Sequence, residues 1–153
     1  MSTGTDHPPP STILCDFDGT LAFYDGFQGA DHLGAPIPRM VERVREWIRQ
    51  GREVVIFTSR LSWGAPTSEV PFETTRATAA HQRKLIKAWL REHIGCELPI
   101  TNVKPYSACE IWDDRAIQVI LNTGMTLREA LEQQKVQRPP KCFRPPATLR
   151  RAS

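Results

Sequence analysis

The stretch that decides the fold is Thr12-Ile13-Leu14-Cys15-Asp16-Phe17-Asp18-Gly19-Thr20. Its first half is apolar and is typical of a buried strand, which we expect over residues 12–17. Asp16 and Asp18 stand at the end of that strand, and residues two apart along a strand share a side. Like charges held that close raise each other's proton affinity unless a positive group joins them. Gly19 then lets the backbone turn sharply and approach a ligand.

This placement of two carboxylates is typical of phosphoryl-transfer chemistry. Such a reaction uses one carboxylate as a nucleophile, a second as an acid or base, and a metal ion to hold the phosphate. Solvated turn carboxylates are the alternative, and the buried strand that precedes Asp16 argues against it. We therefore expect a site for a phosphorylated substrate at this strand end.

Strands and helices alternate along the rest of the chain. The expected strands are 12–17, 53–57, 98–101, 109–112 and 116–121, and the expected helices are 38–50, 75–93 and 126–136. Pro38 suits a helix start, Pro99 suggests a sheet edge, and Thr126 with Glu129 has the capping-box pattern. The alternation predicts an α/β fold with a mainly parallel five-stranded sheet covered on both faces, as three layers. Ligands of such sheets bind beyond the carboxyl ends of the strands.

Polar residues that suit a phosphate site follow the expected strands. They are Thr58, Ser59 and Arg60 after the second strand, Lys104 after the third, and Asp113, Asp114 and Arg115 after the fourth. Lys84, on the preceding helix, rivals Lys104. Asp113 and Asp114 cannot both point the same way from a strand, so one of them could lie outside the direct ligands of a metal.

The order of these pieces resembles the haloacid dehalogenase-like (HAD) superfamily of phosphohydrolases. The resemblance covers roughly residues 12–121, and the Asp113-Asp114-Arg115 segment looks especially like small members of that superfamily. The loop over residues 21–37 is short for an inserted cap, which resembles the capless type. The resemblance implies a Rossmann-like, HAD-type domain over residues 12–136 without a substantial cap.

The family also implies roles for individual residues. Asp16 would be the nucleophile that forms an aspartyl-phosphate, and Asp18 would protonate the leaving oxygen and later activate water. Thr58 would donate a hydrogen bond to a phosphoryl oxygen, and Lys104 would neutralise charge. Mg²⁺, which prefers oxygen ligands, would be the cofactor. Its implied ligands are the Asp16 carboxylate, the Asp18 backbone carbonyl, Asp113 and Asp114, and the substrate-binding candidates are Ser59, Arg60 and Arg115.

Three alternatives stay open beside a general Mg²⁺-dependent phosphatase. The first is a polynucleotide 3′-phosphatase-like enzyme, since such domains share the Asp-Asp-Arg ending. The second is a receiver-like phosphoacceptor, which would need an acid after the third strand, where this chain has Thr101. The third is a non-enzymatic binding protein with the same fold. Arg60 and Arg115 could grip phosphate or only pair with acids.

Charge and composition add expectations about partners and location. Of the 20 Lys and Arg residues, six lie within residues 135–153, which hold no Asp or Glu. This proline-containing tail, 137–153, could contact a polyanion such as a nucleic acid, and residues 1–11 are expected to form a disordered leader. The four cysteines have no metal-site or disulfide spacing. No secretory signal or membrane span is visible, so we expect a cytoplasmic protein. An open site without a cap could need a neighbouring subunit to close it, so a homo-oligomer is a further expectation.

Overall fold

The fold was analysed in a computed structural model, which describes residues 11–62 and 75–137. The chain divides into two compact units, residues 1–116 and residues 117–153. The expected domain over 12–136 contains the boundary between them.

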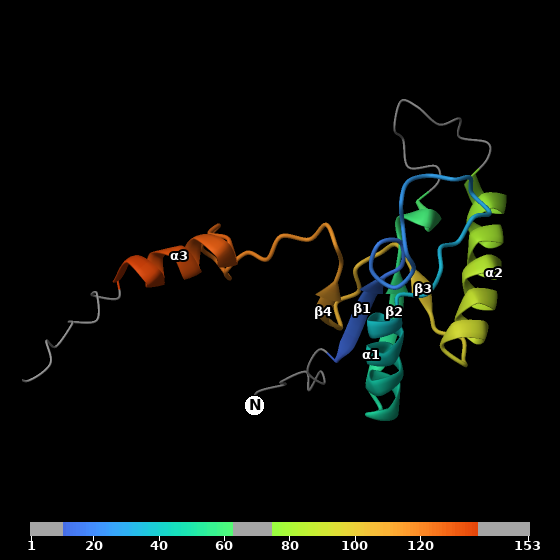
Figure 1. The fold of residues 1–153 in the computed structure, drawn as a ribbon, viewed down its shortest axis with the longest axis horizontal. Coiled ribbons are helices and arrows are strands. Elements are labelled where there is room, and N and C mark those ends of the chain that lie inside the picture. The colour runs from blue at the N-terminus through green and yellow to red at the C-terminus, as the bar shows by residue number, and fades with distance from the viewer. Residues whose placement is uncertain (1–10, 63–74, 138–153) are drawn as a thin grey trace, which may run out of the picture. The chain divides into compact units, whose positions relative to one another are not determined.

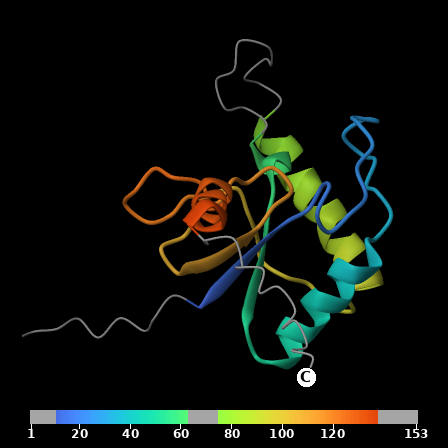
Figure 2. The same ribbon diagram turned by 60° about the vertical axis from the view of Figure 1, so that its left-hand side comes forward.

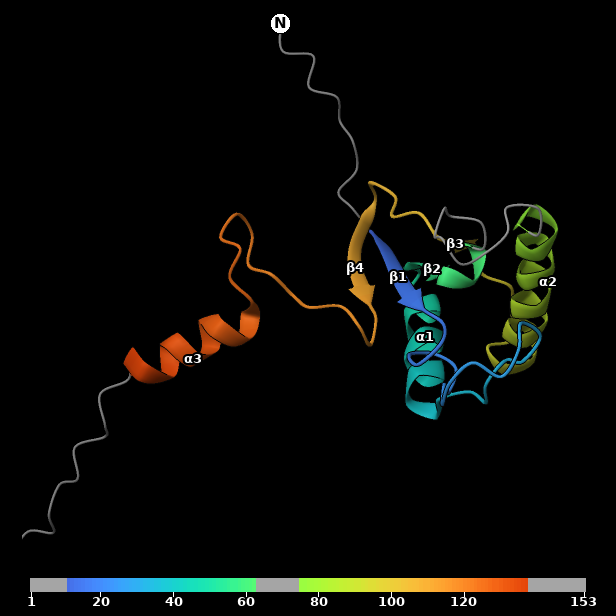
Figure 3. The same ribbon diagram turned by 90° about the horizontal axis from the view of Figure 1, so that it is seen from above.

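The first unit is built on a parallel sheet of four strands (Figure 1). These are β1 (Thr12–Asp16), β2 (Glu53–Phe57), β3 (Ile100–Thr101) and β4 (Ala108–Trp112). Figure 3 shows them in the spatial order β3-β2-β1-β4, which puts β1 in the interior and β3 at an edge, as Pro99 suggested. The predicted α/β fold is therefore confirmed at the level of a parallel sheet with helices.

The register of the strands aligns their carboxyl ends. Asp16 pairs with Phe57 across β1 and β2, and Cys15 pairs with Trp112 across β1 and β4. The residues that follow β2, β1 and β4 consequently emerge at one edge of the sheet. That edge is where ligands of parallel sheets bind.

Two helices of this unit, α1 (Pro38–Arg49) and α2 (Thr75–His93), pack on the same face of the sheet (Figure 2). Proline stands in the first turn of α1, where its missing N–H costs no hydrogen bond. Buried side chains of both helices join the alternate strand residues that point to this face, and the shared cluster includes Ile13, Cys15, Val44, Ile56, Ile86 and Leu90. Burial and the nearby Asp16 raise the pKa of the Cys15 thiol to about 12, so it packs as a neutral core residue.

The segment after the first motif, residues 21–37, folds back on itself. The Phe23 N–H donates to the Ala35 carbonyl at 2.8 Å, and the Ile37 N–H donates to the Leu21 carbonyl at 2.9 Å. A Cβ on Gly34 would lie 1.7 Å from the Phe23 carbonyl oxygen, so only glycine permits this close approach. The expected loop is thus a folded hairpin-like segment, which we call the 21–37 loop.

The second unit contains α3 (Leu127–Gln137) and a turn before it. The Thr126 N–H donates to Glu129 Oε2 at 2.7 Å, and the Glu129 N–H donates to Thr126 Oγ1 at 3.2 Å, which confirms the capping box. The fifth expected strand, 116–121, is not formed among the described residues. Val119, within this segment, forms an isolated antiparallel bridge with Thr126, because the chain turns back at Asn122 and Gly124.

Several expectations lie wholly or largely outside the described residues. These are the leader 1–11, the tail 137–153 and most of the loop over 61–73. Within the parts of the chain that are described, no helix is long and apolar enough to cross a membrane.

Candidate active site

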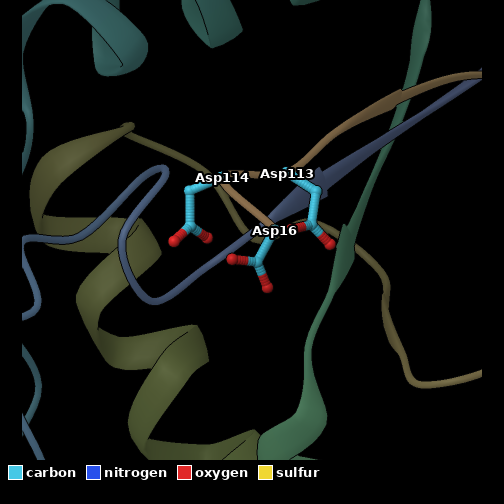
Figure 4. Close-up of side chains that lie close together, drawn as sticks. All are labelled: Asp16, Asp113 and Asp114. Atoms are coloured by element: carbon cyan, nitrogen blue, oxygen red, sulfur yellow. The ribbon is translucent and has the colours of Figure 1, made fainter. Parts of the chain in front are cut away.

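Three carboxylates converge at the carboxyl edge of the sheet. Asp16 ends β1, and Asp113 and Asp114 follow β4 directly. One oxygen from each of the three lies within 4.8 Å of the others, with Asp16 between the other two (Figure 4). Asp113 and Asp114 both belong to the cluster because they follow β4 and are not part of it. The alternation of side chains along a strand therefore does not send them to opposite faces.

Hydrogen bonds to Thr20 tie this cluster together. The Thr20 hydroxyl donates a hydrogen bond to Asp16 Oδ2 at 3.4 Å and accepts one from the Asp114 N–H at 3.1 Å. Asp113 Oδ1 accepts the Arg115 N–H at 2.7 Å, which fixes the turn after β4. Thr20 therefore connects the ends of β1 and β4, a role that we did not assign to it from sequence.

The electrostatics of the cluster are unfavourable without a counter-charge. The pKa of the Asp16 carboxyl rises from 3.8 to about 7, first because the group is buried and second because Asp113 is close by. A hydrogen bond from the Phe17 N–H lowers the pKa, whereas Asp114 and Asp18 raise it further. The folded protein thus holds a carboxyl group that would bind a proton or a cation near neutral pH.

This shift predicts a pH-dependent stability of the metal-free protein. Between pH 4 and pH 7 the folded state keeps a proton on Asp16 that the unfolded state releases, so stability falls as pH rises through this window and levels off above it. We expect the melting temperature in chelator to fall by at least a few degrees more for the wild type than for Asp16→Asn; about 1 kcal/mol produces a change of that size. Equal pH slopes for the two proteins would contradict a titrating Asp16.

Asp18 is not a member of this cluster, and its carboxylate is instead bound by Arg60. Arg60 Nε donates to Asp18 Oδ2 at 2.6 Å and Nη2 donates to Oδ1 at 2.8 Å, a bidentate pair. Arg60 also donates to the carbonyls of Ala30 and His32 in the 21–37 loop and to Oε1 of Gln82. These five bonds match the five donors of a guanidinium, which leaves none for a phosphate in this arrangement.

The residues after β2 form a single turn of 3-10 helix, η1 (Ser59–Leu61). Thr58 is buried and caps this turn, since its Oγ1 accepts the Arg60 N–H at 3.2 Å. Thr58 immediately follows Phe57, the register partner of Asp16, so it lies at the same sheet edge as the carboxylates. A threonine hydroxyl that accepts a bond can still donate its own hydrogen. Ser59 is exposed beside it.

The remaining predicted residues carry exposed side chains. Lys104 lies in the loop after β3, and β2 separates that strand from β1 in the sheet. Lys84, its rival, is exposed on α2, and Arg115 is exposed beside Asp114. The described residues bring neither lysine into the carboxylate cluster, so the choice of Lys104 as the catalytic lysine stays a prediction.

Gln82 is a second residue that sequence reasoning missed. Its side chain is completely buried, accepts from Arg60 Nη1 at 3.1 Å and donates to the Ala30 carbonyl at 2.8 Å. A signal was present, because Gln82 lies four residues before Ile86 on the core face of α2. A polar residue at a core position needs a partner, and the partner here is the arginine that holds Asp18.

A hollow adjoins the Asp18–Arg60 pair. Both residues line it, together with residues of the 21–37 loop that include Phe23, Tyr24 and Phe27. Asp18 and three aromatic residues therefore line the same hollow.

Models of known protein families, curated proteins and solved structures were compared with this chain, and none matches it.

Proposed function

We propose that this protein is a Mg²⁺-dependent phosphohydrolase that acts through an aspartyl-phosphate on Asp16. The observation that carries the proposal is the convergence of Asp16, Asp113 and Asp114 within 4.8 Å at the carboxyl edge of a parallel sheet. The resemblance to HAD-type hydrolases and to their three-layer, Rossmann-like domain is part of this proposal.

The donor set fits Mg²⁺. Ligand oxygens about 2.1 Å from an octahedral ion lie about 3 to 4 Å from one another, a spacing that oxygens held within 4.8 Å reach by small movements. The raised pKa of Asp16 supports the same reading, since a cation would relieve the repulsion that raises it. Asp16, Asp113 and Asp114 would hold the ion, which would supply charge stabilisation to the phosphoryl oxygens.

The protein's own residues account for the remaining chemistry. An Asp16 oxygen attacks phosphorus and forms an acyl phosphate, while the bond to the leaving oxygen breaks. Asp18 gives that oxygen a proton and then takes one from the water that attacks the intermediate, which restores Asp16 and releases phosphate. Arg60 binds both Asp18 oxygens in the ionised form, so one of these bonds must be released before Asp18 carries the proton that it gives. Thr58 lies at the same sheet edge, where its hydroxyl can donate to a phosphoryl oxygen.

A screen of phosphate monoesters tests this function. Hydrolysis is expected with Mg²⁺ and not with excess chelator, and it should be lost in the variant Asp114→Ala. A protein that hydrolyses no monoester with Mg²⁺, or that is fully active in chelator, would contradict the proposal.

Gly19 offers a separate test of the metal site. Its φ is +88°, and a Cβ there would lie 3.0 Å from Asp114 Oδ2. Gly19→Ala should therefore push the Asp114 carboxylate aside and weaken Mg²⁺ binding by about tenfold or more, the scale expected when a ligand is disoriented. The measurement is the Mg²⁺ concentration that half-saturates the rise in melting temperature.

Gly51→Ala is the matched control for backbone strain. Gly51 also has a positive φ, +73°, but a Cβ there would meet nothing within 4 Å. Both variants should lose stability, and only Gly19→Ala should lose Mg²⁺ affinity. Equal Mg²⁺ affinity in the two variants would mean that Asp114 is not a ligand.

A further inference from the structure

The hollow beside Asp18 is unusually rich in exposed aromatic side chains. Phe23 is 58% exposed, Tyr24 is 51% exposed and Phe27 is 66% exposed, and all three line the hollow. Single exposed aromatic residues are common on proteins, but three within one short segment around one hollow mark an interaction site.

The chemistry of the adjoining site limits what can enter this hollow. Asp18 is the residue that would protonate the leaving oxygen, and it is one of the residues that line the hollow. The group attached to that oxygen therefore lies on the same side of the phosphate as the aromatic rings. The hollow is in the right place to bind the leaving group and not the phosphoryl group.

The charged residues around the hollow limit the class of ligand that it can bind. The 21–37 loop contains Asp25, Asp31 and His32 but neither lysine nor arginine. Among the described residues that line the hollow, Arg60 is the one arginine or lysine, and it is committed to Asp18, Gln82 and two loop carbonyls. The described part of this surface offers no free lysine or arginine to additional phosphates, whereas it suits an uncharged flat ring that can stack on aromatic side chains.

The loop is held in place before any ligand arrives. Arg60 and Gln82 bind the Ala30 carbonyl, and Trp89 Nε1 donates to the Gly34 carbonyl at 2.9 Å. At the tip, Gln28 Nε2 donates to Asp25 Oδ1 at 2.6 Å. A fixed surface loses less conformational freedom on binding, which favours affinity for a rigid ring.

We propose that the Phe23–Phe27 segment is a stacking platform for a nucleobase, so that the substrate is a phosphate ester whose leaving group carries a base. This inference rests on the proposed phosphohydrolase activity, and it names the substrate class of the same site. A free nucleotide and the terminal nucleotide of a strand present the same chemistry, and the experiment distinguishes them.

The kinetic test compares adenosine 5′-monophosphate with glycerol 3-phosphate, which has no ring. The wild type should show the higher kcat/KM for the nucleotide. Tyr24→Ala should lower that value by about tenfold, the scale of one base–aromatic stack, and should lower the value for glycerol 3-phosphate by much less. Tyr24→Phe should restore the nucleotide value because it keeps the ring. A 3′-phosphorylated oligonucleotide in the same assay shows whether a strand end is used in preference to a free nucleotide.

Tyr106→Ala is the matched control, because Tyr106 is 90% exposed and does not line the hollow. It should leave the preference for the nucleotide intact. Equal kcat/KM for the two esters, or equal losses on both esters in Tyr24→Ala, would overturn the platform.

A binding measurement separates this inference from the phosphohydrolase proposal. Adenosine, which has no phosphate, is titrated into the metal-free protein and into Tyr24→Ala. Binding that the substitution weakens supports the platform even when no ester is hydrolysed, in which case the activity proposal alone fails. Hydrolysis of esters without adenosine binding, and without an effect of Tyr24→Ala, overturns the platform and leaves the activity proposal intact.

Discussion

Asp16→Asn is expected to remove phosphohydrolase activity by at least about a thousandfold, the scale on which loss of a covalent nucleophile acts. The amide has nearly the same shape as the carboxylate but is a far poorer nucleophile. The substitution also removes a charge from a buried site crowded by Asp113 and Asp114, so the metal-free variant should be at least as stable as the wild type above pH 7.

Asp31→Asn is the matched control for this experiment. Asp31 is exposed and pairs with His81 at 2.6 Å, away from the three-carboxylate cluster. The control variant should keep its activity. If Asp16→Asn retains activity within about tenfold of the wild type while it folds normally, Asp16 is not the nucleophile, because that loss is far below the scale for such a group.

Arg60→Ala is expected to produce the largest loss of stability among the site variants, roughly 3 kcal/mol, as when one partner of a mostly buried ion pair is removed. The Arg60 and Asp18 side chains are only 13% and 17% exposed. Without the guanidinium, the Asp18 carboxylate loses both of its hydrogen bonds from Arg60, and the carbonyls of Ala30 and His32 each lose a donor. Urea denaturation measures the change in free energy of unfolding.

Arg115→Ala is the control for the loss of one arginine. Its side chain is exposed, and its recorded bond to Asp113 is made by the backbone N–H, so the free energy of unfolding should change by less than about 0.5 kcal/mol. Equal losses in Arg60→Ala and Arg115→Ala would show that the bidentate pair contributes nothing special. Activity of the two variants separately tests whether either arginine serves the substrate.

Local patterns were sufficient to predict most of the first unit. The apolar segment before Asp16 and the segment Glu53–Phe57 form the expected strands, and Pro38 marks a real helix start. In the second unit, the capping box at Thr126 likewise marks the start of α3. The expected strand over 116–121 failed for a physical reason. A short apolar run indicates burial or β-propensity, but only a neighbouring strand of the right register makes it part of a sheet.

The carboxylate cluster was predictable because strand ends of a parallel sheet meet at one edge. The partner of Asp18 was not predictable. Arg60 and Asp18 are 42 residues apart, and their contact depends on the conformations of the two loops that carry them. Arg60 was expected at phosphate or beside an acid, and the structure places it beside the acid. Thr20 was recognisable as a hydroxyl residue inside the first motif. Gln82 was recognisable as a polar residue on the core face of a helix.

The central claim is that Asp16 becomes covalently phosphorylated, and trapping of that intermediate tests it most directly. Wild-type protein is mixed with Mg²⁺ and a phosphate ester that it hydrolyses, quenched in acid within the first turnover, and analysed by peptide mass spectrometry. We expect a mass increase of one phosphoryl group on the peptide that contains Asp16, and no increase in Asp16→Asn or in chelator. A phosphoryl group on another residue, or rapid turnover with no phosphorylated peptide at any quench time, would contradict the claim.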